Sequence, residues 1–174
     1  MLVDLSQIQQ EPKTYYLHLP EEWWLQDVPN DQIRGLYEPV YARLTIEKIG
    51  KRFMVRGELK TTLMLQCDRC LDLYARELTA DFHLFLEPLS NERIMDEEVE
   101  LADEEMGVDL VPGQIVELEH IIKEQIYLSI PMKTLCKEDC LGLCPTCGVN
   151  RNKEKCSCHV IQGHPAFQEL RKLL

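Results

Sequence analysis

Residues 40–65 read VYARLTIEKIGKRFMVRGELKTTLML, and apolar and polar side chains alternate along most of this stretch. Alternation with a period of two is typical of a β-strand that has one buried and one solvated face. Gly50-Lys51 interrupts the alternation and suits a turn. The stretch therefore predicts two antiparallel strands, near 40–48 and 52–66, joined as a hairpin.

The strand pattern continues on both sides of this hairpin. Alternating apolar residues from Leu78 to Leu86 predict a third strand near 72–87. Short apolar pieces at Leu2–Leu5 and Tyr15–Leu19 predict additional edge strands.

Farther along the chain the apolar spacing becomes helical. Ile115, Leu118, Ile122 and Ile126 predict a helix over about 114–129. Pro131 marks its end, because the residue before a proline is biased away from helix.

The order of strands followed by a helix predicts an α+β fold. We expect an antiparallel sheet, partly open and barrel-like, with the helix covering one face. This sheet-and-helix domain is expected to cover residues 1–135, and a cysteine-rich, zinc-binding segment to follow over 136–174 as an appendage. A short helix is expected near the end, over Pro165–Leu174.

The charge is strongly acidic and unevenly distributed. The 174 residues carry a formal net charge of −11, which argues against a protein whose whole surface attracts phosphate and favours basic polypeptides as partners. Between Glu92 and Asp109, nine acids accompany one base, Arg93. This stretch predicts a solvated loop, and the alternative is a docking surface for a basic partner.

The sequence also indicates a compartment. No apolar run approaches the roughly 18 residues needed to span a bilayer, and the N-terminal MLVDLS lacks a basic segment followed by an apolar one. We therefore expect a cytoplasmic protein without membrane contact.

Disulfides are rare in such a reducing compartment, so the eight cysteines need another role. The sequence does not specify an oligomeric state.

The cysteines predict two metal sites. Cys144-Pro145-Thr146-Cys147-Gly148 has the form of a zinc knuckle, and Cys156-Ser157-Cys158 supplies two further thiolates for a closed, structural site. The remaining pairs, Cys67/Cys70 and Cys136/Cys140, form a second four-cysteine site if the helix packs on the sheet. We expect two Zn2+ ions with four cysteine ligands each. Cys140 and Cys144 are close in sequence, so an exchanged ligand set stays open.

Other cysteine chemistry competes with structural zinc. A thioredoxin-type C-x-x-C normally opens a helix after a strand, whereas Cys67 and Cys70 lie between two strand patterns. Iron–sulfur clusters also use four cysteines, although knuckles that end in glycine favour zinc. A catalytic zinc normally keeps an open position and has histidine or carboxylate ligands. His159 and His164 are near, but the cysteines already suffice. The sequence shows no nucleophile–base arrangement and no phosphate-binding loop.

These motifs resemble the YceD family. The resemblance is carried by Cys67 and Cys70 after a long amphipathic strand, by Leu128-Ser129-Ile130-Pro131 at the end of the helix, and by the run CKEDCLGLCPTCGVN over 136–150. It covers most of the chain from about residue 40 onward. The sequence departs from the family near its end, where His164-Pro165-Ala166 stands in place of Asp-Pro-Arg, so no role of that arginine carries over.

The resemblance implies a function in the assembly of the large ribosomal subunit. It implies a non-enzymatic factor that supports accumulation and processing of large-subunit (23S) ribosomal RNA. The implied partners are pre-ribosomal large-subunit RNA, a basic large-subunit ribosomal protein, or both. The competing hypothesis is an enzyme, either a thiol oxidoreductase or a zinc-dependent hydrolase that acts on RNA.

Basic side chains of the hairpin and of the loop between the two C-terminal cysteine pairs are candidates for RNA contacts. Phosphate groups are bound most often by arginine and lysine. Glu47 and Glu58 interrupt the hairpin set, and an ordinary solvated sheet face is the alternative interpretation. The candidates are Arg43, Lys51, Arg52, Arg56, Lys60, Arg151, Lys153 and Lys155.

Overall fold

A computed structural model describes residues 1–9, 11–24, 32–89 and 108–158. The helix predicted over Pro165–Leu174 lies outside these residues, as does most of the acidic stretch that begins at Glu92. The strands are β1 (Leu2–Asp4), β2 (Lys13–Leu19), β3 (Ile33–Ile49), β4 (Arg52–Gln66), β5 (Leu73–Leu89), β6 (Val108–Pro112) and β7 (Ile115–Glu117). Two short 3-10 helices, η1 (Leu5–Gln7) and η2 (Glu21–Trp24), accompany one α-helix, α1 (Leu118–Ser129).

The strands form two sheets. The larger sheet has the order β2-β3-β4-β5-β6, and the smaller one pairs β1 with β7. β2, β3 and β4 pair antiparallel, whereas β6 runs parallel to β5. The sheet is therefore mixed, and the prediction of an antiparallel sheet was wrong only at β6 among the described strands of this sheet. The described part is mostly sheet with one α-helix, as predicted in outline, and the barrel-like closure stays a prediction.

The central hairpin follows the alternation of its sequence. β4 spans Arg52–Gln66, as the pattern predicts. β3 begins at Ile33, earlier than predicted, because register shifts between Ile33 and Tyr41 interrupt the alternation. An extra residue at a β-bulge moves the following side chains to the opposite face, so a period of two cannot be read through it.

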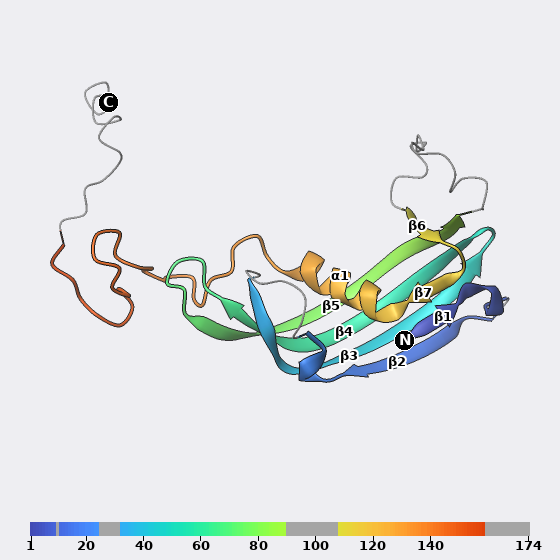
Figure 1. The fold of residues 1–174 in the computed structure, drawn as a ribbon, viewed down its shortest axis with the longest axis horizontal. Helices are drawn as coiled ribbons and strands as arrows, with labels where there is room; N and C mark the ends of the chain where they lie inside the picture. The colour runs from blue at the N-terminus through green and yellow to red at the C-terminus, as the bar shows by residue number, and fades with distance from the viewer. Residues whose placement is uncertain (10, 25–31, 90–107, 159–174) are drawn as a thin grey trace, which may run out of the picture. The chain divides into compact units, whose positions relative to one another are not determined.

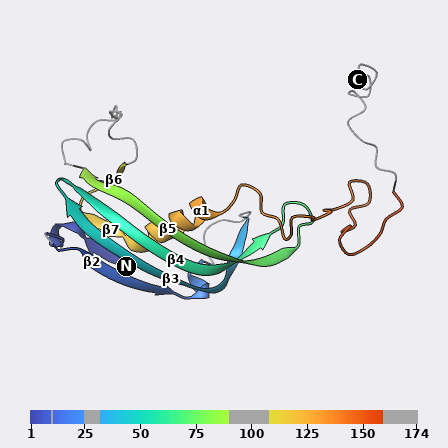
Figure 2. The same ribbon diagram turned by 180° about the vertical axis from the view of Figure 1, so that it is seen from behind.

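The core lies between α1 and one face of the large sheet. Leu118, Ile121, Ile122 and Ile126 are the buried side chains of α1, and Figures 1 and 2 show the helix lying along a single face. The helix begins at Leu118 and not near 114, because Ile115–Glu117 pair with β1 as β7. Among the described residues, no helix combines the length and apolar character that a membrane crossing requires.

One close approach explains a glycine within β4. Gly57 lies opposite Leu44 in the β3–β4 register. A Cβ atom at position 57 would lie 2.2 Å from Cζ of Phe82, well inside van der Waals contact. The Phe82 ring therefore occupies the space that any larger residue at position 57 would need.

The described residues divide into two compact units. We call Met1–Leu65 with Ala75–Met132 the sheet unit, and Gln66–Tyr74 with the residues from Lys133 onward the cysteine unit. The predicted division into 1–135 and 136–174 stays a prediction. Of the acidic stretch predicted as a loop over 92–109, only Val108 and Asp109 lie among the described residues, and they belong to β6.

Candidate metal centres

The first cysteine cluster joins two segments that are distant in sequence. Cys67 and Cys70 lie in the connection between β4 and β5, and Cys136 and Cys140 lie after α1. The Sγ atoms of Cys67 and Cys140 are 3.8 Å apart, and those of Cys70 and Cys136 are 3.7 Å apart. All four sulfur atoms lie within 4.8 Å of one another, which makes a single group of possible ligands.

A tight turn presents the first cysteine pair. The backbone N–H of Leu71 donates to the carbonyl of Cys67 (2.9 Å), and the N–H of Cys67 donates to the carbonyl of Asp72 (2.9 Å). Leu71 has a φ of 61° without being glycine. This left-handed conformation costs roughly 1 kcal/mol or more for a residue with a side chain. The surrounding turn must therefore hold it in place.

Reciprocal hydrogen bonds clamp the second segment onto this turn. The N–H of Asp68 donates to the carbonyl of Thr134 (2.8 Å), and the N–H of Thr134 donates to Oδ2 of Asp68 (2.7 Å). The Thr134 hydroxyl, which is fully buried, donates to the carbonyl of Gln66 (3.0 Å). The Arg69 guanidinium donates to the carbonyl of Cys140 (2.9 Å). These contacts tie the segment that carries Cys136 and Cys140 to the turn that carries Cys67 and Cys70.

The second cluster is built from Cys144, Cys147, Cys156 and Cys158. Gly148 has a φ of 74°, and its N–H donates to the carbonyl of Cys144 (2.8 Å). This conformation favours glycine, which explains why the knuckle closes there. Cys144 is buried, whereas Cys147 is exposed. The second cluster is therefore more open to solvent than the first.

A hydrogen-bond network connects the two clusters within the cysteine unit. The N–H of Leu143 donates to the carbonyl of Arg69 (3.0 Å). Asn152 donates from Nδ2 to Sγ of Cys140 (3.3 Å) and accepts at Oδ1 from the N–H of Leu141 (2.9 Å). Asp72 accepts from Asn150 Nδ2 (2.8 Å) and from Lys153 Nζ (2.9 Å). The loop between the two C-terminal cysteine pairs thus supports the first cluster as well as the second.

The thiols of each cluster differ in acidity. Burial opposes ionisation of Cys67, but three backbone N–H groups outweigh it and lower its pKa to about 6. Burial and the neighbouring sulfurs raise the pKa of Cys136 to about 12. In the second cluster, backbone N–H groups lower the pKa of Cys144 to about 6, and a hydrogen bond with Cys147 raises the pKa of Cys158 to about 12. One thiolate therefore forms readily in each cluster, and ionisation of all four sulfurs requires a cation.

The spacing of the sulfur atoms fits one tetrahedral ion. Around an ion bound ~2.3 Å from each thiolate, neighbouring sulfurs lie about 3.8 Å apart. The two closest pairs of the first cluster lie at 3.7 and 3.8 Å, far beyond the ~2.05 Å of a disulfide bond. In the described ranges, both groups consist of cysteine alone, without histidine or carboxylate. Such a donor set suits a closed site for a thiophilic metal ion.

Replacement of Asn152 tests whether the network supports the first cluster. Asn152→Ala removes the donor to the Cys140 sulfur and the acceptor for Leu141. We expect the first cluster to bind Zn2+ about 10- to 100-fold more weakly, as is typical when an outer hydrogen bond to a ligand is lost. Competition with a chromophoric chelator measures the affinity. Lys155→Ala, an exposed neighbour, is the matched control, and equal affinities of the two variants would contradict this role of Asn152.

The sequence did not point to the residues that position the cysteines. Asp68, Thr134, Asn150 and Asn152 are not themselves metal-ligand types in these motifs. Their hydrogen-bond partners lie between two and 78 positions away in the sequence. Only the asparagines adjoining the knuckle, Asn150 and Asn152, offered a signal, because asparagine is frequent in turns.

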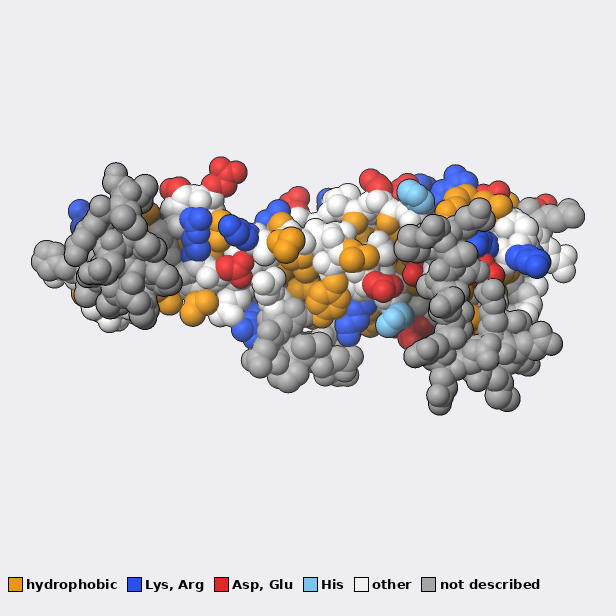
Figure 3. Space-filling model, turned by 90° about the horizontal axis from the view of Figure 1, so that it is seen from above, with side chains coloured by type: hydrophobic (Ala, Val, Ile, Leu, Met, Phe, Trp, Pro, Cys, Tyr) orange, Lys and Arg blue, Asp and Glu red, His pale blue; other side chains and the backbone are white. Residues whose placement is uncertain are grey.

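The candidate RNA-contact residues occupy three places. Arg43, Arg56 and Lys60 lie on the solvated face of β3 and β4. Arg43 pairs with Glu58 (2.6 Å) and Arg56 with Glu47 (3.1 Å). Lys51 lies in the hairpin turn. Arg52, the first residue of β4, pairs with Glu87 (2.8 Å). Arg151, Lys153 and Lys155 lie in the cysteine unit. Acidic and basic side chains are intermingled on the face drawn in Figure 3.

Comparison with known proteins decides the family. The family model described as "Large ribosomal RNA subunit accumulation protein YceD" matches residues 55–174, well over half of the chain. The chain belongs to the YceD family.

Curated relatives agree with this family assignment. The chain is 26% identical over 140 residues to the Arabidopsis thaliana protein named "Large ribosomal RNA subunit accumulation protein YCED homolog 1, chloroplastic", an alignment that covers 69% of this chain and 44% of that protein. It is 24% identical over 142 residues to the Zea mays protein of the same name, with 69% and 48% covered. This YceD-family chain thus spans about half the length of its plant relatives.

A bacterial relative matches more of the chain. An uncharacterized protein of Mycobacterium tuberculosis is 28% identical over 155 residues, which cover 86% of this chain and 70% of that protein. No solved structure matches the chain.

Proposed function

We propose that this YceD-family chain is a non-enzymatic assembly factor that supports accumulation and processing of large-subunit (23S) ribosomal RNA. The observation that carries the proposal is the family match over residues 55–174. The names of the plant relatives contain the words "Large ribosomal RNA subunit accumulation protein". The partners in this proposal are pre-ribosomal large-subunit RNA, a basic large-subunit ribosomal protein, or both.

The proposed role of the cysteines is structural. Each cluster holds one Zn2+ ion with four cysteine ligands: Cys67, Cys70, Cys136 and Cys140 in the first, and Cys144, Cys147, Cys156 and Cys158 in the second. Four sulfurs fill every position of a tetrahedral ion and leave none for a substrate or a water molecule. Eight unpaired thiols suit a reducing compartment, for which we propose the cytoplasm.

Metal content separates this proposal from an enzymatic one. If the native chain holds two zinc ions and no thiol that reacts in a titration, the cysteines form a structural scaffold. A thiol oxidoreductase would instead carry free, acidic thiols at Cys67 and Cys70, which form a reversible disulfide. The position of this pair in a turn between two strands, and not at a helix N-terminus, supports the scaffold.

Ribosome fractionation tests the proposed function. We expect the protein to sediment with precursors of the large subunit at low salt and to leave them progressively as salt rises, because each phosphate contact releases counterions. Fractions of the small subunit serve as the control. A strain that lacks the gene should accumulate less large-subunit RNA. Absence from every large-subunit precursor fraction, with normal levels of that RNA in the deletion strain, would refute the proposal.

A further inference from the structure

The face of the large sheet opposite α1 carries exposed aromatic side chains. Tyr16 on β2 and Tyr41 on β3 have 75% and 57% of their surface exposed. The antiparallel register places Tyr16 opposite Arg43 and His18 opposite Tyr41. The rings of His18 and Tyr41 lie 4.8 Å apart with an angle of 32° between their planes. Three rings and one guanidinium thus occupy adjacent positions on two paired strands.

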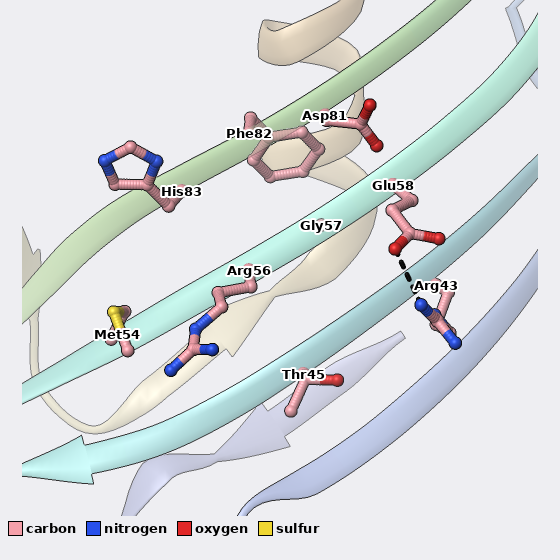
Figure 4. A pocket seen from close by; sticks show the side chains of 9 residues that line it. All are labelled: Arg43, Thr45, Met54, Arg56, Gly57, Glu58, Asp81, Phe82 and His83. Atoms are coloured by element: carbon pink, nitrogen blue, oxygen red, sulfur yellow. Dashed lines mark hydrogen bonds and ion pairs between the residues drawn. The ribbon is translucent and has the colours of Figure 1, made fainter.

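Two adjoining hollows lie on this face. The first, of about 540 Å3, is bordered by Tyr16, His18, Tyr41 and Lys60. The second, of about 810 Å3, is bordered by Arg56 and His83, and it shares Arg43, Glu58 and Asp81 with the first. Figure 4 shows the second hollow with α1 behind the strands, on the side away from the hollow. We call these two hollows with their bordering side chains the aromatic sheet face.

The charges of this face nearly cancel. The basic side chains of Arg43, Arg56 and Lys60 stand against the acidic side chains of Glu58 and Asp81. The face is therefore close to neutral in a chain whose net charge is −11. A polyanion such as RNA meets no excess of acidic side chains on this face. It finds cationic side chains beside the aromatic rings. A basic protein, in contrast, finds no acidic patch to attract it.

We infer that the aromatic sheet face binds single-stranded RNA, with unpaired bases stacked on Tyr16 and Tyr41 and phosphates contacted by Arg43 and Lys60. This inference rests on the proposed function for the identity of the RNA. Bases of a duplex are already stacked and paired, so exposed rings on an open sheet can accept only unpaired bases. Stacking on aromatic side chains tolerates any base sequence, because every base has a π-face.

The balance of charge predicts a shallow salt dependence. Each phosphate contact contributes about −0.7 to the slope of log K against log salt for single strands. The three basic side chains of this face therefore give a slope no steeper than about −2. A markedly steeper slope would mean that binding is mainly electrostatic and occurs elsewhere on the chain.

Tyrosine replacement in the full-length, metal-loaded protein tests the inference. The probe is a fluorescently labelled single-stranded RNA of about twelve nucleotides and mixed sequence, and anisotropy measures the affinity. We expect Tyr16→Ala and Tyr41→Ala each to weaken binding about tenfold, within the range known for loss of one stacked base. Tyr41→Phe keeps the ring and should bind as the wild type does. The same sequence as a duplex should bind about tenfold more weakly.

Tyr37→Ala is the matched control. Tyr37 lies on β3 and is 57% exposed, as is Tyr41, but it borders neither hollow. Its replacement should leave the affinity unchanged. Equal affinities of wild type, Tyr16→Ala and Tyr41→Ala would overturn the inference, as would equal losses from Tyr37→Ala and Tyr41→Ala. Loss of binding to a basic peptide, and not to RNA, in the Tyr41→Ala variant would also overturn it.

The outcomes separate this inference from the proposed function. If the wild type sediments with large-subunit precursors but the tyrosine variants bind RNA normally, the inference fails and the function stands. If the variants lose RNA binding but the wild type sediments with no precursor and the deletion strain keeps normal levels of large-subunit RNA, the RNA surface stands and the function fails.

Discussion

Removal of metal from the native protein is expected to unfold the cysteine unit and to leave the strands of the sheet unit in place. The cysteine unit has a small buried cluster, in which Tyr74, Leu135 and Cys136 pack around three buried cysteines. Such a cluster buries too little apolar surface to offset the conformational entropy of the chain. Structural zinc contributes roughly 10–16 kcal/mol of apparent binding free energy per site, which becomes folding free energy.

The sheet unit has a core of its own and does not depend on the ions. Its completely buried side chains include Leu44, Ile46, Leu59, Leu63 and Ile122. Hydrogen exchange read by mass spectrometry distinguishes the two units after chelation at neutral pH. Amides of 66–74 and 133–158 should lose protection, amides of β3 and β4 should keep it, and added Zn2+ should restore the first set. Unchanged protection in the cysteine unit, after metal loss is verified by elemental analysis, would show that the unit folds without the ions.

The substitution Cys67→Ser is expected to lower the metal content from two ions per chain to one. Cys67 is fully buried and lies 3.8 Å from Cys140. A serine oxygen is a poor replacement for a thiolate, and the three remaining sulfurs stay close together in a buried site without a fourth ligand. Loss of a metal site is among the few changes that destabilise a protein by more than about 4 kcal/mol. We expect a loss of that size in the cysteine unit.

Elemental analysis and thermal unfolding together check this expectation. Lys137→Ser, an exposed neighbour of Cys136, is the control and should keep both ions. Cys144→Ser should remove the other ion and leave the first cluster filled. If Cys67→Ser lost both ions, the eight cysteines would form one shared set and not two groups of four. If it kept both, Cys67 would not be a ligand.

The central hairpin shows what local pattern can predict. The alternation predicted over 52–66 matches β4, whose burial alternates from Arg52 to Lys60, because the register shifts of this hairpin place their extra residues in β3. The knuckle from Cys144 to Gly148 was equally visible, because two thiolates and one left-handed glycine lie within five residues. In both cases, the residues that specify the structure are neighbours in sequence.

Other elements depend on partners that are far away in the chain. Ile115–Glu117 have the apolar spacing of the helix that follows, but they form β7 because the backbone of β1 pairs with them. β6 is short and weakly patterned, and it is a strand because β5 offers a free edge. Intrinsic preference is weak in such short segments, so tertiary pairing decides their conformation.

The sequence alone determined the hairpin, the knuckle and the presence of eight cysteines at ligand-like spacings. It also determined the resemblance to the YceD family. Only the tertiary structure decided that Cys67 and Cys70 meet Cys136 and Cys140, that Asn152 supports their sulfurs, and that Arg43 and Arg56 are paired with acids. The physical reason is distance along the chain. A contact between residues 66 or more positions apart in the sequence depends on how whole elements pack. The periodic pattern of the local sequence does not predict it.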